Sequence, residues 1–126
     1  MQARLPDAVV FYDQALRIYR DIGARLGEAD TLQSLGHAAR IQGRYSDAIA
    51  LYDQALPIYR ETGDRRGEAI TLAGHATALA TNGSPSAPLV LEEAVRRTAE
   101  AGLEEQSKEL QRLLDAATAS AEQIET

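Results

Sequence analysis

The residues best suited to chemistry are two histidines, His37 and His75, and the aspartates Asp13 and Asp53 of a duplicated YDQAL stretch. Neither histidine has a carboxylate at ligand spacing beside it, and a zinc site needs three or four converging ligands. Each aspartate follows a tyrosine, and we interpret both as solvated repeat positions. No phosphate-binding glycine loop or nucleophile elbow is present. The pattern predicts a non-enzymatic chain without catalytic residues, metal or cofactor.

Composition narrows the class of protein further. The 126 residues suit a single domain with a modest core. The chain has no cysteine, which excludes disulfides and zinc–thiolate sites. Its net charge is −6 with no basic stripe, which argues against direct nucleic-acid binding because phosphate neutralisation dominates that affinity. No apolar run reaches the roughly 18 residues of a membrane span, and no signal core is seen. We expect a cytoplasmic protein without membrane contact.

An internal repeat organises the sequence. The stretch YDQALRIYR at 12–20 returns as YDQALPIYR at 52–60, an offset of 40 residues, and Gly-Glu-Ala at 27–29 returns at 67–69. Beyond Gly83 the register slips by one, and an eroded third copy follows, with Ser-Pro-Ser-Ala-Pro at 84–88 in place of Arg-Tyr-Ser-Asp-Ala at 44–48. A period of 20–50 residues indicates a repeat architecture. The duplicated stretch is therefore a packing face and not a duplicated active site.

Each repeat unit is predicted to hold two helices. Apolar residues recur at three-to-four spacing in 27–43, where Leu32 and Leu35 share one face, and again in 44–63, where Tyr52 and Leu56 do. Small alanines between these large residues allow the two helix backbones to approach closely. We interpret Gly27, like Gly43, Gly63 and Gly67, as a helix boundary.

These residues resemble the tetratricopeptide repeat, in its long variety of about 40 residues that is found in bacterial regulatory proteins with C-terminal repeat arrays. The resemblance covers about residues 4–103. It is carried by the Gly-Asp-Arg link at 63–65, by the Gly-Glu-Ala that follows it, and by the string Leu35-Gly36, Ala39, Gly43, Tyr45, Ala48, Tyr52 and Ala55.

The resemblance implies an all-α, right-handed α-solenoid of about six helices, forming one domain over residues 1–126. We expect a lone second-type helix at 5–22, a repeat at 27–62, a degenerate repeat at 67–101 and a capping helix at 104–123. In the last helix Leu110 and Leu114 mark the apolar face, and acidic residues cover the others. The same pattern could form a short coiled coil, although serine and alanine at its seam weaken that alternative.

Proteins of this family bind a protein or peptide on the concave face, which the first helix of each pair lines. By register, the groove positions are Asp30, Gln33, Ser34, His37, Arg40, Ile41, Ile70, Ala73 and Thr77. Some members hold the acidic C-termini of heat-shock chaperones with a lysine, asparagine and arginine clamp. That clamp is missing here, so we exclude this partner class. A sensor of small ligands has no residue-level support.

The first helix suggests a second function. Val9, Phe11 and Leu16 belong to a helix that is apolar on more than one side, and such a helix is expected to be buried. Two interpretations stay open. The chain could be a fragment of a longer array, or the first helix could be covered by another copy in a homodimer, which would make the chain a self-assembly module.

Overall fold

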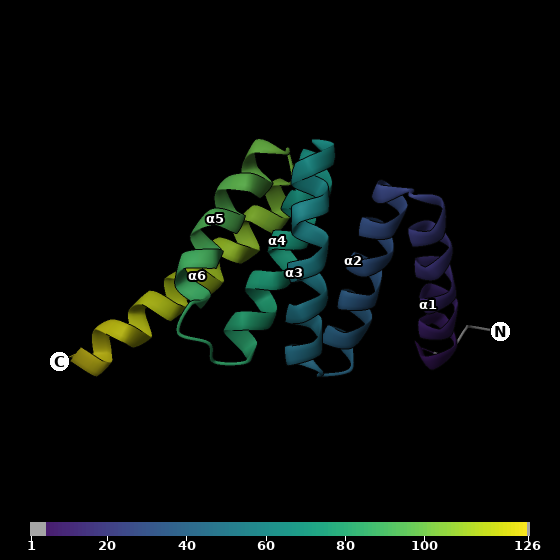
Figure 1. The fold of residues 1–126 in the computed structure, drawn as a ribbon. Coiled ribbons are helices and arrows are strands. Elements are labelled where there is room, and N and C mark those ends of the chain that lie inside the picture. The colour runs from purple at the N-terminus through teal and green to yellow at the C-terminus, as the bar shows by residue number, and fades with distance from the viewer. Residues whose placement is uncertain (1–4, 126) are drawn as a thin grey trace.

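The computed structural model describes residues 5–125, which form six helices joined by short turns (Figure 1). The helices are α1 (Leu5–Ile22), α2 (Arg25–Ile41), α3 (Tyr45–Thr62), α4 (Arg65–Thr81), α5 (Ala87–Glu100) and α6 (Glu104–Glu125). Each helix packs against the next along the row, and α4 also contacts both α2 and α6. Within the described range no strand is present, so the prediction of an all-α helical-repeat solenoid is confirmed.

Glycines end the helices, but only some of the predicted boundary glycines do so. Gly63 follows α3 with φ at 75°, a left-handed conformation that residues with a side chain rarely adopt. The other turn glycines, at 23, 43, 83 and 102, share this conformation. Helices α2 and α4, however, begin two residues earlier than predicted, at Arg25 and Arg65. Gly27 and Gly67 therefore lie inside helices, and interpreting them as boundaries was wrong.

Gly27 and Gly67 instead make room for tyrosine rings of the preceding helix. A Cβ atom placed on Gly27 would lie 2.6 Å from ring carbons of Tyr19, and one placed on Gly67 would collide with the ring of Tyr59. Real Cβ atoms do not approach other atoms so closely. The pairs Tyr19 with Gly27 and Tyr59 with Gly67 thus mark the same close contact between consecutive helices in two repeats.

Tyr52 makes the same kind of contact on two sides at once. Its side chain is fully buried, and it lies between Gly36 of α2 and Gly74 of α4. A Cβ atom on Gly36 would be 2.6 Å from Cε1 of Tyr52, and one on Gly74 would be 2.7 Å from its hydroxyl oxygen. Gly36, from the Leu-Gly pair of the motif, and Gly74 therefore let α3 insert a ring between α2 and α4, the first helices of two successive pairs.

Helix α6 covers the last repeat with one face. Leu110 is buried in a cluster with Leu72 and Leu91, and Leu113 and Leu114 pack against that cluster. The Ser107 hydroxyl donates to the carbonyl of Val95 on α5 at 3.1 Å. Farther along, α6 extends away from the other helices, at the yellow end of the ribbon (Figure 1). These are the contacts that a capping helix would make with its own chain.

We expect Gly36→Ala to lower the free energy of unfolding by about 1–3 kcal/mol, because a methyl group must displace the ring of Tyr52. Urea denaturation measures the change. The exposed Ser46→Ala in α3 is the control and should stay within about 0.5 kcal/mol of the parent. The loss should shrink in a Tyr52→Leu background, where the ring is gone. A gain in stability from Gly36→Ala, as helix propensity alone would give, would contradict the packing argument.

Candidate functional site

A hollow of about 200 Å³ opens between α2, α4 and α6. It is lined by His37, Arg40, Ile70, Ala73, Gly74, Thr77, Gln106, Glu109 and Leu110. Five of the nine predicted groove residues are in this set, so the structure brings the α2 and α4 positions together. The contribution of α6 was not predicted, because the sequence analysis treated that helix only as a cap.

The floor of the hollow is made by small and apolar side chains of α4. Ile70 and Ala73 are half-buried, and Gly74 is buried against Tyr52. The Thr77 hydroxyl donates to the carbonyl of Ala73 at 2.8 Å, so its hydrogen is already used within the helix. A bound group would therefore meet mostly carbon atoms on this side of the hollow.

The α2 side of the hollow carries a short chain of hydrogen bonds. Arg40 Nε lies 3.4 Å from the Tyr52 hydroxyl oxygen, and that oxygen lies 2.6 Å from His37 Nδ1. A guanidinium can only donate, so the tyrosine oxygen accepts from Arg40, and among the described residues His37 Nδ1 is the acceptor within reach of the tyrosine's own hydrogen. We therefore assign the proton of neutral His37 to Nε2.

Two pKa shifts indicate that neither ring of this pair is charged. Burial, and in second place the positive charge of Arg40, lowers the pKa of His37. Burial also raises the pKa of Tyr52, although Arg40 opposes that shift. His37 is thus neutral and Tyr52 keeps its proton near pH 7, which leaves His37 Nε2–H and the terminal nitrogens of Arg40 as donors beside the hollow.

The other predicted groove residues lie outside the hollow, and two of them bind neighbouring helices. The Tyr59 hydroxyl donates to Asp30 at 2.5 Å, and Gln33 Nε2 donates to the Thr71 hydroxyl at 2.8 Å and to a carbonyl of α4 at 3.3 Å. Ser34 donates to a carbonyl of its own helix, and Ile41 is exposed near the end of α2. Asp30 therefore joins the two helices of one repeat, and Gln33 joins that repeat to the next.

Only some of the residues proposed for self-association are exposed enough to contact another copy. Phe11 is 67% exposed, whereas Val9 is half-buried. Leu16 is buried in a cluster with Leu32 and Ile58, so including it in a free surface was wrong. Two further exposed residues, Ile18 and Ile22, follow Phe11 at positions i+7 and i+11, which places them on one helical face. We call Phe11, Ile18 and Ile22 the α1 stripe.

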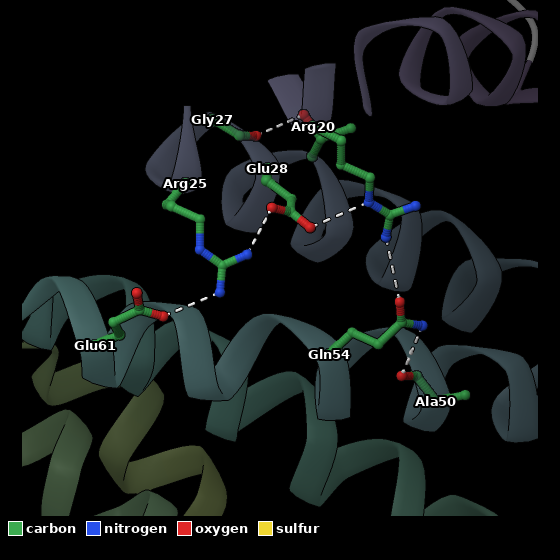
Figure 2. Close-up of polar contacts among 8 residues, drawn as sticks. Arg20, Arg25, Gly27, Glu28, Ala50, Gln54 and Glu61 are labelled. Carbon is green, nitrogen blue, oxygen red and sulfur yellow. Dashed lines mark hydrogen bonds and ion pairs between the residues drawn. The ribbon is translucent and has the colours of Figure 1, made fainter. Parts of the chain in front are cut away.

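The sequence analysis missed an ion-pair cluster that joins the first three helices (Figure 2). Glu28 of α2 accepts from Arg20 Nε of α1 at 3.1 Å and from Arg25 at 2.9 Å. Arg25 also donates to Glu61 of α3 at 3.0 Å. The signal was the repeated Gly-Glu-Ala with an arginine two residues before it, which we had considered only as a mark of the repeat type.

The second histidine pairs with one of the duplicated aspartates. His75 Nε2 lies 3.0 Å from Asp53 Oδ1, so Asp53 does more than face water. His75 Nδ1 is buried and has no hydrogen-bond partner among the described residues. Over the same residues, no group of three histidine or acidic side chains is placed to hold a metal ion.

The comparison with protein-family models finds one match, to the tetratricopeptide repeat, over residues 1–61 and 28–100. No curated protein matches the chain. In the part of the chain that the structure covers, no helix is both long enough and apolar enough to cross a membrane.

The half-buried position of His37 predicts a pH dependence of stability. Its pKa is lowered in the folded protein, so the unfolded chain binds the proton more readily and stability falls as the pH drops below about 6.5. We expect urea denaturation to show a smaller loss between about pH 7 and pH 5 for His37→Gln than for the parent protein. Equal losses in the two proteins would contradict a neutral, buried His37.

Proposed function

The chain belongs to the tetratricopeptide-repeat family, whose repeats generally mediate protein–protein interaction, and we propose that it is a non-enzymatic scaffold that binds a partner protein segment between α2, α4 and α6. The observation that carries this proposal is the hollow itself, which has an apolar floor on α4 and hydrogen-bond donors on α2. The long repeat variety supports a place within a bacterial regulatory protein of the cytoplasm.

The size of the hollow favours one bulky apolar side chain of a bound segment. At about 200 Å³ it is smaller than the roughly 300–1,000 Å³ typical of pockets for small molecules. A peptide can instead place a single anchoring side chain over Ile70, Ala73 and Leu110 while the rest of it stays outside. This argues for a protein segment over a small-molecule ligand.

The polar rim complements the backbone of such a segment. His37 Nε2–H and the terminal nitrogens of Arg40 are donors, so they suit carbonyl oxygens next to the anchor. Gln106 of α6 lies on the opposite wall and offers both a donor and an acceptor. Glu109, on the same wall, already accepts from Arg112 at 2.6 Å.

A second candidate function is self-association through the α1 stripe. In the repeat register Phe11 and Ile18 correspond to Leu51 and Ile58 of α3. Ile58 is only 4% exposed, and Leu51 is half-buried, because they pack in a cluster with residues of α1 and α2. The α1 stripe therefore has the composition of a packing face, yet within the described chain its residues stay exposed.

The composition of α6, at the opposite end of the solenoid, favours a dimer in which α1 of one copy contacts α1 of the other. By register Gln111 and Asp115 of α6 correspond to Leu72 and Ala76, which pack against α5. Both α6 residues are polar and exposed, so these two positions offer no apolar counterpart to the α1 stripe in a head-to-tail contact. In an antiparallel pair of α1 helices, Phe11 of each copy would meet Ile18 of the other.

Selection from a random-peptide display library tests the groove proposal. We expect enriched peptides to share a bulky apolar residue and to lose at least about tenfold in affinity for Ala73→Phe, because the new ring occupies the hollow. Fluorescence polarisation measures the affinity, and circular dichroism confirms the fold of each variant. The control is Ala50→Phe, the same substitution on the exposed face of α3. Peptides that bind Ala73→Phe as well as the parent protein would contradict the proposed site.

Light scattering behind a sizing column tests self-association. We expect a dimer that dissociates on dilution, and Ile18→Glu should make the protein monomeric because it places a charge in the contact. The control is Leu89→Glu, which changes a leucine on α5 that lies away from the stripe and is even more exposed than Ile18. A monomer at concentrations up to about 1 mM, or a dimer that Ile18→Glu leaves intact, would refute this second function.

A further inference from the structure

The ion-pair cluster around Glu28 has a counterpart one repeat later, around Glu68, and the two are built differently. In the first cluster both arginines bind Glu28 at hydrogen-bond distance, from Arg20 Nε at 3.1 Å and from Arg25 at 2.9 Å (Figure 2). Arg25 continues to Glu61 of α3. This carboxylate is therefore fully engaged by arginines, as a purely structural ion pair should be.

The second cluster is looser. Arg60 Nε lies 3.7 Å from Glu68, and Arg97 Nε, from α5, lies 3.6 Å from it. Both distances are too long for hydrogen bonds, and the described part of the chain provides no hydrogen bond to the Glu68 carboxylate. Arg65 corresponds to Arg25 by register, but it makes no ion pair with a described acidic residue.

The loose contacts surround a polar hollow of about 480 Å³. It is lined by Tyr59, Arg60, Gly63, Arg65, Glu68 and Arg97. Three guanidinium groups therefore face one carboxylate, whose side chain is only 14% exposed. Arg60 and Arg97 also pair with Glu93 and Glu100 at 3.4 Å each, but neither of those acids lines this hollow. The hollow thus combines three arginines, two of them also paired with acids outside it, with one carboxylate that accepts no hydrogen bond from the described residues.

A protonated oxyanion can bind both the arginines and the Glu68 carboxylate. Its free oxygens accept from arginine, and its hydroxyl group can donate to a carboxylate. We propose that this hollow binds inorganic hydrogen phosphate, with Arg60, Arg65 and Arg97 donating to the phosphate oxygens and Glu68 accepting the P–OH hydrogen. Sulfate has no hydrogen at neutral pH, so it would bring two anions together without a hydrogen bond between them.

The site is separate from the partner groove. It lies between α3, α4 and α5, whereas the groove lies between α2, α4 and α6. Phosphate binding thus goes beyond the proposed scaffold function, and the failure of one proposal leaves the other standing.

Anion titrations of the full chain at constant ionic strength test the proposal. The probes are sodium phosphate and sodium sulfate at about pH 7.5, followed by calorimetry and by amide NMR of the turn at Gly63. Ionic strength is held constant because salt screens exposed charges. We expect saturable phosphate binding that is at least about tenfold tighter than sulfate binding, since sulfate leaves Glu68 without a donor.

Three variants separate a built site from general charge attraction. Arg65→Gln should weaken phosphate binding several-fold without unfolding the protein, because Arg65 makes no ion pair that the fold depends on. Glu68→Gln should abolish the preference for phosphate, since its amide can donate to sulfate. Arg25→Gln, the same change in the closed first cluster, should leave phosphate binding unchanged.

Several results would overturn the proposal. One is weak, non-saturating shifts of equal size with both anions, and another is equal loss of binding in Arg65→Gln and Arg25→Gln. Methyl phosphate distinguishes a phosphate ester from the free ion, because a monoester has lost its second proton at about pH 8, with a pKa near 6. Equal binding of methyl phosphate and phosphate at that pH would refute the role of the P–OH group.

Discussion

The insertion of Tyr52 between two glycines is the contact on which the rest of the structure depends. Because Gly36 and Gly74 lack side chains, a single ring can lie against α2 and α4 at once, fully buried. The ring also carries its hydroxyl to the edge of the α2–α4 groove, where it fixes the tautomer of His37. Core packing and the polarity of the groove are therefore set by one residue, and a change in the ring position would alter both.

Polar side chains of the first-type helices divide into two groups with different roles. Asp30 is engaged with Tyr59 of the same repeat and Gln33 with Thr71 of the next, so these two residues hold α2 against α3 and α4. Farther along α2, His37 and Arg40 are linked to each other only through Tyr52, which leaves donors free beside the hollow. The hollow is thus narrower than the register positions indicate, because Asp30, Gln33, Ser34 and Ile41 lie outside it and the first three are engaged in other hydrogen bonds.

The sequence was sufficient to predict the helices, because apolar periodicity and turn glycines are local signals. It was insufficient where the outcome depends on a neighbour. Leu16 and Phe11 are both apolar in one helix, and only the position of α2 and α3 decides that Leu16 is buried and Phe11 exposed. Gly27 could equally end a helix or admit a ring, since glycine serves both purposes. The part of the hollow's lining that α6 supplies depends on how that helix packs, which no local pattern encodes.

The two ends of the solenoid differ in a way that links stability to function. On one face of α6, Leu110 is buried in the core. Gln111 and Asp115 of the same helix are exposed to water, so α6 closes the core at that end. The same helix places Gln106 and Glu109 across from α2, which turns an open helical surface into a bounded hollow. One helix therefore both packs on the last repeat and lines the hollow, which ties the hollow to this end of the array. Helix α1 has no such cover among the described residues, so any contact at that end must come from another surface, whether a second copy or a further segment.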